Sequence, residues 1–377
     1  MKKVLVVMLS LALMLALTAP ALAGEPKIAI LSSPATQNDE ELSQALAEIA
    51  RTPGMIVHDT YSDAFMAEQE LTISKLLAFA DDPDVKAIVM CQAVPGCEPG
   101  FNKIREMGRD DILLIGVLPQ EDPDVISASA DFTINTDPIT QGEQMIEKMV
   151  EWDIDVFLHY SFPRHMAMEP IVLRYNLFRE LCDALGIEMY DVVSPDPTNE
   201  ATGGTPAAQQ FVLEDVPAQM EKYAGKKVAM FSTNCAMQPA LQRAILEQPN
   251  AYYPSPCDPS PFHRFPETLS LELKPSDGTE VALKQIAAAL AEHGALNRFS
   301  TWDAPATMMG MEVAVEYARE WIAGTITERN DMDALVRLFH ERSPLAVIDR
   351  YTNVDGVTFD NYYVLGLTYV DFNDYLD

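Results

Sequence analysis

Short apolar segments alternate with longer amphipathic segments along most of this chain, and this alternation limits its fold more than any other feature. Residues 27–31 form an apolar segment that ends at Ser32-Ser33-Pro34, and Asn38 or Asp39 can then cap a helix running to about residue 50. The same order of strand, turn and helix recurs up to about residue 323. Strands that alternate with helices form parallel sheets with right-handed crossovers, so the sequence predicts an α/β fold.

The predicted strands are the apolar segments that end in turn-forming residues. They are residues 27–31, 55–58, 85–91, 112–117, 132–135, 156–158, 188–193, 227–232 and 298–302. A long helical segment at 139–152 follows the first five strands, and the pattern then starts again. We expect the proline-rich residues 252–266 to form a lid or surface loop, and the aromatic tail from Asp333 to pair with or cover a sheet edge.

The N-terminus has the pattern of a secretory signal. Lys2 and Lys3 precede an apolar core at residues 4–17, and Ala21-Leu22-Ala23 supplies a small-residue cleavage site. The core is shorter than the roughly 20 apolar residues that a membrane-spanning helix needs. We therefore predict a signal peptide at residues 1–23 and an extracytoplasmic protein, secreted or periplasmic. Removing 23 of the 377 residues leaves 354, which suggests two lobes.

The net charge and the cysteine content limit which partners the protein can bind and how far disulfides can stabilise its fold. The formal net charge of −31 would repel phosphate backbones, so we expect no nucleic-acid partner. Five cysteines are too few and too scattered for a disulfide scaffold. Cys91 and Cys97 bracket a turn-like spacer, and two alternatives stay open for them: a local disulfide or two buried free thiols.

Residues 155–165 form the stretch that most suggests a binding site. Its apolar run suits a buried strand, and Pro163 ends that strand. Tyr160, Ser161, Phe162, Arg164 and His165 then stand at the carboxyl end, where ligands bind in open α/β sheets.

Two successive α/β halves behind a secretory signal resemble the type I periplasmic binding proteins, the superfamily of ribose-binding proteins and of the ligand-sensing halves of LacI-type repressors. The resemblance covers about residues 27–323 and includes the first strand, the crossover at 135–140, the strands at 155–164 and 227–234, and 299–303 followed by the helix at 308–323. The chain is also similar to an uncharacterised secreted branch of these proteins. The tail from Asp333 departs from the family by its length.

The resemblance implies two Rossmann-like lobes with parallel sheets, joined by a hinge. The N-terminal lobe would comprise residues 24–136, with residues 304–330 returning to it, and the C-terminal lobe residues 137–303. Residues 331–377 would form a C-terminal crossing and the aromatic tail.

In that architecture the ligand lies between the lobes, held by side chains at the strand ends. The candidate ligand-binding residues are Ser32, Ser33, Gln92, Tyr160, Phe162, Arg164, His165, Asn234, Trp302 and Asp303. The resemblance carries over most directly to Arg164, Asn234 and Asp303. Each candidate has a structural alternative: Arg164 could be an ion-pair partner, Trp302 could plug the lobe interface, and His165 could be a hydrogen-bonded core residue.

Sequence motifs for catalysis are absent. The nucleophile-elbow, P-loop, zinc-protease and dinucleotide-binding patterns do not occur. Cys235 follows a strand, as a nucleophile could, but the nearest histidine in sequence is His263 in the proline-rich segment. We read Met308, Met309 and Met311 as helix core, and we expect no catalytic residue, no cofactor and no metal.

Together these observations indicate a monomeric solute-binding protein that closes on a small polar ligand, such as a sugar, a nucleoside or a related metabolite. The resemblance implies that it serves the membrane permease of an ABC-type transporter. The alternatives are a sensory receptor subunit of the same fold, acting on a sensor protein, and a secreted hydrolase that uses Cys235. The identity of the ligand is left open.

Overall fold

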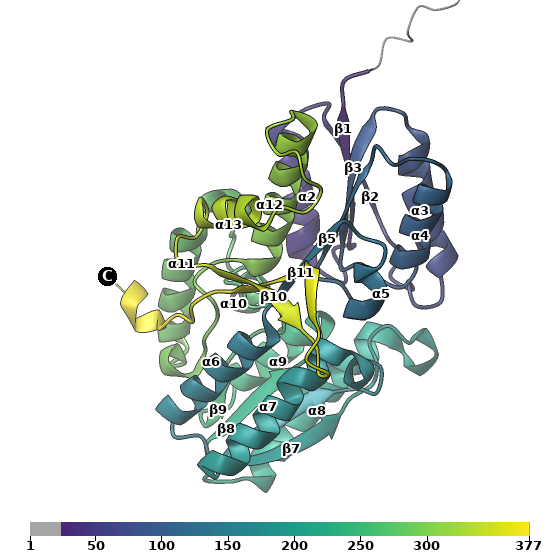
Figure 1. Ribbon diagram of the computed structural model, residues 1–377. Coiled ribbons are helices and arrows are strands. Elements are labelled where there is room, and N and C mark those ends of the chain that lie inside the picture. The colour runs from purple at the N-terminus through teal and green to yellow at the C-terminus, as the bar shows by residue number, and fades with distance from the viewer. Residues whose placement is uncertain (1–23, 377) are drawn as a thin grey trace, which may run out of the picture.

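Two α/β lobes make up the computed structural model, which describes residues 24–376 (Figure 1). The first lobe contains a seven-stranded sheet of order β10-β11-β5-β4-β3-β1-β2, and the second contains a four-stranded sheet of order β7-β6-β8-β9. The predicted fold class is therefore confirmed. The predicted signal peptide at residues 1–23 lies outside the described residues. Within residues 24–376, no helix is both long and apolar enough to cross a membrane.

The first lobe begins with five parallel strands connected by helices. The strands are β1 (Lys27–Ser32), β2 (Ile56–Thr60), β3 (Val85–Cys91), β4 (Leu113–Val117) and β5 (Phe132–Thr136), and the helices are α2 (Asp39–Arg51), α3 (Gln69–Asp81), α4 (Cys97–Glu106) and α5 (Pro123–Ser127). Along β1, Ile28 and Ile30 join one apolar cluster and Ala29 and Leu31 join another. The strand is apolar throughout because helices cover both faces of the sheet.

The second lobe repeats this arrangement around a smaller sheet. Its strands are β6 (Val156–Ser161), β7 (Glu188–Val193), β8 (Val228–Ser232) and β9 (Ala251–Tyr252), and its helices are α6 (Pro138–Glu151), α7 (Glu169–Leu185), α8 (Gly204–Lys222), α9 (Gln238–Leu246), α10 (Phe265–Leu269) and α11 (Thr279–Glu292). Helix α7 ends where Gly186 adopts a left-handed conformation with φ of 76°, as glycine does readily.

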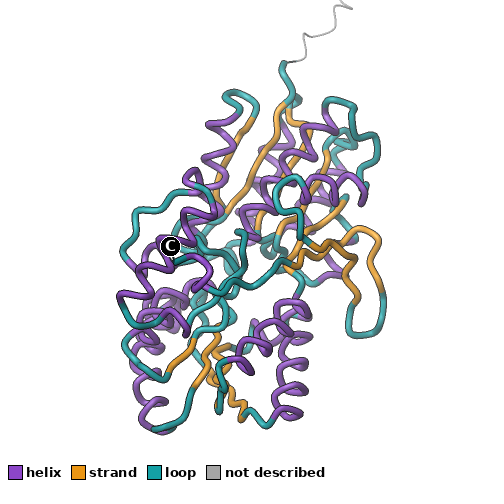
Figure 2. Tube along the Cα trace, turned by 90° about the vertical axis from the view of Figure 1, so that its left-hand side faces the viewer, coloured by secondary structure: helices purple, strands orange, loops and turns teal. Residues whose placement is uncertain are grey.

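The chain crosses between the lobes three times. The first crossing joins β5 to α6, and the second leads to α12 (Ala306–Ile322), which packs on α2 and on β3 and β4. After α13 (Met332–His340), strands β10 (Val347–Thr352) and β11 (Thr358–Gly366) pair with each other in antiparallel fashion, and β11 pairs with β5. The third crossing then carries Phe372 into the apolar core of the second lobe. Figure 2 shows loops gathered at this junction.

The aromatic tail thus extends the edge of the first sheet and returns to the second lobe, so its expected pairing with a sheet edge is confirmed. The predicted strand at 298–302 is wrong. Residues Leu296–Arg298 form a 3-10 turn, and Phe299 and Trp302 make only isolated bridges, to Tyr253 and Tyr369. The two crossing segments lie side by side at this point. Neither has a long neighbouring strand with which it could pair.

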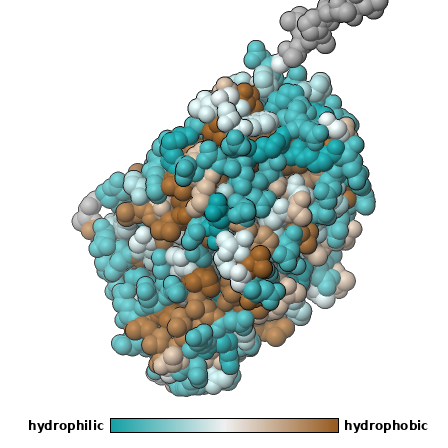
Figure 3. All heavy atoms as spheres, in the orientation of Figure 1, coloured by the Kyte–Doolittle hydropathy of each residue, from teal (hydrophilic) through white to brown (hydrophobic). Residues whose placement is uncertain are grey.

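Hydrophilic residues cover most of the molecular face in Figure 3, with apolar patches over the second lobe.

Cys91 and Cys97 are both buried free thiols, which settles the alternative left open by their spacing.

Candidate ligand-binding site

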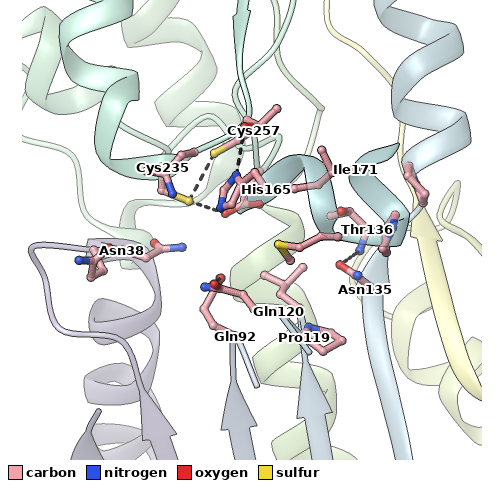
Figure 4. Close-up of a pocket in the computed structure, with 18 of the residues that line it drawn as sticks. Asn38, Gln92, Pro119, Gln120, Asn135, Thr136, His165, Ile171, Cys235 and Cys257 are labelled. Carbon is pink, nitrogen blue, oxygen red and sulfur yellow. Dashed lines mark hydrogen bonds between the residues drawn. The ribbon is translucent and has the colours of Figure 1, made fainter. Parts of the chain in front are cut away.

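A cavity of about 110 Å³ lies between the lobes, at the carboxyl ends of the strands of both sheets (Figure 4). The first lobe lines it with residues that follow β1, β2, β3 and β4 or end β5: Gln37, Asn38, Tyr61, Gln92, Leu118, Pro119, Gln120, Asn135 and Thr136. The hinge and second lobe contribute Pro138, His165, Met168, Pro170, Ile171, Arg174, Thr233, Asn234, Cys235, Cys257 and Asp258. Open α/β sheets bind ligands at this end of their strands.

The first-lobe wall carries side-chain amides held in fixed positions. Gln92 adopts a left-handed conformation with φ of 58° directly after β3. Its Nε2 donates to Oε1 of Glu41 at 2.6 Å, and its Oε1 accepts a hydrogen bond from Gln120 Nε2 at 3.1 Å. Burial raises the pKa of Glu41 to about 7, although bonds from Gln92 and Ser33 act to lower it. The amide ends of Gln92 and Gln120 are thereby positioned toward the cavity.

The second-lobe wall carries a buried cation with no carboxylate partner. Arg174, on α7, is 6% exposed, donates to Oε1 of Gln141 and lies over the ring of Phe231 at 4.9 Å. Its Nε has no hydrogen-bond partner, and no acidic side chain in residues 24–376 forms an ion pair with it. A buried charge normally requires a partner, so this guanidinium is suited to meet an anionic or hydroxylated ligand.

His165 stands beside this cation as a neutral group. Its Nδ1 lies 3.0 Å from Oγ1 of Thr233, and its ring packs on Phe162 with centroids 4.2 Å apart. Burial and the charge of Arg164 lower the pKa of His165 well below its ordinary value. The neutral imidazole can therefore accept or donate one hydrogen bond.

Two thiols, a carboxylate and an imidazole meet at the other end of the cavity. The Sγ of Cys235 lies 3.3 Å from Sγ of Cys257 and 3.0 Å from Oδ2 of Asp258. The Sγ of Cys257 lies 3.5 Å from Nε2 of His263. In His263, burial acts to lower the pKa, but the bonds with Cys235 and with Glu40 outweigh it and raise the pKa well above its ordinary value.

Both thiols are weaker acids than an ordinary cysteine. The hydrogen bond with Cys257, together with burial, raises the pKa of the Cys235 thiol well above its ordinary value. Burial also raises the pKa of the Cys257 thiol.

Only three of the ten predicted residues line the cavity: Gln92, His165 and Asn234. Ser33 and Phe162 lie one layer behind, because Ser33 donates its backbone N–H to Glu41 and Phe162 packs on His165. Ser32 is fully buried, with its Oγ 2.9 Å from Nε2 of His58.

Arg164 lies beside the cavity and is already paired. Its Nε donates to Oδ2 of Asp196 at 2.9 Å, and its Nη1 donates across the lobes to Oε1 of Gln120 at 3.3 Å. This arrangement is the ion-pair alternative considered for Arg164, combined with a contact between the lobes.

Tyr160, Trp302 and Asp303 point away from the cavity. The Tyr160 hydroxyl donates to Asp215 of α8 at 2.9 Å, on the side of the sheet that α8 covers. Trp302 is fully buried at the crossing, where its Nε1 donates to Gln144 at 2.9 Å, as expected for a residue that plugs the lobe interface. Asp303 bonds the backbone of Thr368 in the neighbouring crossing.

Sequence reasoning missed Arg174, Cys257 and Asp258. Arg174 lies within a helix, and Cys257 and Asp258 lie in the proline-rich segment, so none of them directly follows a predicted strand. The spacing of Cys235, Cys257 and His263 matches no common motif. The sequence feature that could have revealed this part of the site is the presence of a cysteine, an aspartate and a histidine close together in the proline-rich segment.

The sequence matches the family described as "Protein of unknown function (DUF3798)" over residues 27–300. Two uncharacterised proteins of Treponema pallidum (strain Nichols) are similar. One is 36% identical over 144 residues, which cover 38% of this chain and 65% of that protein. The other is 31% identical over 172 residues, which cover 46% of this chain and 78% of that protein. The chain thus matches slightly less than two thirds of the first relative's length.

Solved structures share the fold at low identity. A putative transcriptional regulator from Clostridium difficile 630 has a TM-score of 0.68 and 22% identity, over 93% of this chain and 99% of that one. A substrate-binding protein of a sugar ABC transport system from Bordetella parapertussis 12822 has a TM-score of 0.56 and 14% identity, over 93% and 91%.

A third similar structure is an ABC transporter solute-binding protein from Clostridium phytofermentas with bound L-rhamnose. It has a TM-score of 0.55 and 11% identity, over 94% of this chain and 98% of that one. These likenesses show that this chain has the two-lobe fold of periplasmic binding proteins.

Proposed function

The chain belongs to the DUF3798 family of proteins of unknown function, and we propose that it is an extracytoplasmic solute-binding protein that closes on one small polar molecule. The observation that carries this proposal is the cavity between the lobes, whose polar groups come from both. A ligand that contacts both lobes favours the closed arrangement over the open one by its differential affinity.

The lining groups indicate the chemistry of the solute. Gln92, Gln120, Asn135 and Asn234 offer amides, and Arg174 offers an unpaired buried cation. A volume near 110 Å³ is comparable to cavities that hold one benzene-sized molecule. These features favour a compact polyhydroxylated or anionic solute, such as a monosaccharide, a nucleoside fragment or a related metabolite, over an oligomer.

The two lobes already touch beside the cavity, as a closed form requires. Nη2 of Arg264 donates to the carbonyl oxygen of Gln37 at 3.1 Å, and the Tyr351 hydroxyl donates to Glu169 at 3.1 Å. We propose that the closed monomer delivers its solute to an ABC-type permease outside the cytoplasmic membrane. A sensory role, in which the closed form acts on a signalling protein, is the alternative for the same site.

Thermal unfolding of residues 24–377 with a panel of sugars, nucleosides and carboxylates tests solute binding. A solute at 100 times its dissociation constant stabilises the folded state by about 2.7 kcal/mol, which raises the melting temperature by a few degrees. We expect Arg174→Met to weaken binding of that solute at least tenfold, because the charge-assisted bond is lost. Arg179→Gln, on the exposed side of α7, is the matched control.

Two results would contradict solute binding at this site. One is the absence of any shift across all solute classes. The other is an affinity that Arg174→Met leaves equal to that of the control. Small-angle scattering should also show a more compact particle with the solute than without it.

A thiol hydrolase is the second candidate, because Cys257, His263 and Glu40 follow one another at hydrogen-bond distances like a nucleophile, a base and an orienting carboxylate. The raised pKa values of both thiols argue against it, since the thiolate is the nucleophile. Turnover of ester or amide substrates that is abolished by Cys257→Ser would support the hydrolase instead.

A further inference from the structure

The cluster at the end of the cavity contains four side chains that can each offer a metal ligand. Cys235 follows β8, while Cys257, Asp258 and His263 lie in the proline-rich segment. Their ligand atoms all lie within 4.8 Å of one another. Figure 4 shows Cys235 and Cys257 side by side at the wall opposite Gln92 and Gln120.

The spacing of these atoms is close to that of a tetrahedral zinc site. Zinc–sulfur bonds of about 2.3 Å and zinc–nitrogen or zinc–oxygen bonds of about 2.0 to 2.1 Å place neighbouring ligand atoms roughly 3.3 to 3.8 Å apart. The contacts within the cluster are 3.3 Å between the two sulfurs, 3.5 Å from Cys257 to His263 and 3.0 Å from Cys235 to Asp258. Small movements of the side chains would therefore admit the ion.

The histidine is supported as metal-binding histidines usually are. Its Nδ1 lies 3.0 Å from Oε2 of Glu40, which leaves Nε2 facing the thiols. The other oxygen of Glu40 accepts a hydrogen bond from Ser260. His263 is fully buried and Glu40 is 3% exposed, so this pair is held in a fixed orientation. A carboxylate behind a ligating imidazole fixes its tautomer and increases its basicity.

We propose that Cys235, Cys257, Asp258 and His263 bind a Zn²⁺ ion at the lobe junction, with Glu40 as the positioning residue for His263. Two thiolates and one imidazole favour zinc over magnesium or calcium, which prefer oxygen ligands. Two thiolates and a carboxylate exceed the charge of the ion by one, and Arg174 lines the same cavity as Cys257 and Asp258. The positive charge of Arg174 can therefore balance the excess negative charge of the site.

Metal binding at this site favours the closed arrangement of the lobes. The four ligands belong to the second lobe, whereas Glu40 lies on α2 of the first lobe. The inference goes beyond the proposed solute binding and does not depend on the identity of the solute, because the ion is held by its own set of ligands.

Zinc titration of residues 24–377 tests the site. The protein is purified with a reductant, stripped with a chelator and titrated with Zn²⁺ alone against a chromophoric competitor. We expect one equivalent to bind, with Cys257→Ser and His263→Gln each weakening affinity at least 100-fold. Glu40→Gln should weaken it 10- to 100-fold, as loss of an outer-shell partner does. Cys182→Ser, which removes a buried thiol elsewhere in the second lobe, should bind like the unmodified protein.

Co²⁺ in place of Zn²⁺ supplies a readout that does not require a variant to fold. Thiolate coordination should give a charge-transfer absorption in the unmodified protein. The proposal is overturned if the reduced protein binds no zinc, if Co²⁺ gives no such absorption, or if Glu40→Gln and Cys182→Ser bind zinc equally well.

The same preparations separate this inference from the proposed function. A solute-induced rise in melting temperature that persists in chelator, together with no zinc binding, would refute only the metal site. Zinc binding without any solute-induced shift would refute only the solute-binding role.

Discussion

Glu41 connects the cavity wall to the pH dependence of stability. This residue of α2 is 1% exposed; its Oε1 accepts from Gln92 Nε2 at 2.6 Å and its Oε2 accepts from the Ser33 N–H at 3.1 Å. Burial raises its pKa from an ordinary 4.5 to about 7. Between these values the folded protein holds a proton that the unfolded chain has released. Stability is therefore greatest below about pH 4.5 for this group and falls as the pH rises to about 7.

The size of the effect follows from the shift in pKa. A shift from 4.5 to about 7 corresponds to about 3.5 kcal/mol, at about 1.4 kcal/mol per pKa unit. Glu41→Gln removes the charge and keeps the shape of the side chain. One of its two partners loses an acceptor, which costs about 1 kcal/mol at any pH.

Urea unfolding in the presence of a chelator measures this effect. It is carried out at about pH 5 and about pH 8, because the contribution of Glu41 changes between its unfolded and folded pKa values. We expect the free energy of unfolding of Glu41→Gln, relative to the unmodified protein, to rise by about 2.5 kcal/mol between the two conditions, because pH 5 already lies above the unfolded pKa. Glu180→Gln, on the exposed face of α7, should change by less than about 0.5 kcal/mol. A difference for Glu41→Gln that stays constant with pH would refute the reasoning, because it would mean that the bonds from Gln92 and Ser33 fully offset burial.

Two further substitutions distinguish structural residues from cavity residues. Trp302→Ala should lower the free energy of unfolding by about 3 to 5 kcal/mol, because it empties a fully buried site and removes the hydrogen bond to Gln144. A loss below about 1 kcal/mol in urea unfolding would contradict this expectation. Arg164→Gln should cost about 1 kcal/mol through its partly buried pair with Asp196, and it should weaken solute binding less than Arg174→Met does. Calorimetry showing the reverse order would place the solute at Arg164.

The local pattern of the sequence determined the two lobes and part of the cavity wall. Apolar runs such as β1 and β8 can be buried on both faces only in a covered parallel sheet, and residues that directly follow such strands must stand at one edge of it. For this reason Gln92, His165 and Asn234 could be predicted as cavity residues. The side of a strand on which a residue lies was harder to predict, and Tyr160 points to the opposite side.

Tertiary structure alone decided the rest. Strand β11 pairs with β5 across more than 200 residues of sequence, and no local periodicity encodes such a partner. Arg174 reaches the cavity from within a helix, and the course of the proline-rich segment, which brings Cys257 and His263 to Cys235 and Glu40, depends on contacts with both lobes. Periodicity specifies which residues are buried, whereas long-range packing specifies which buried groups meet.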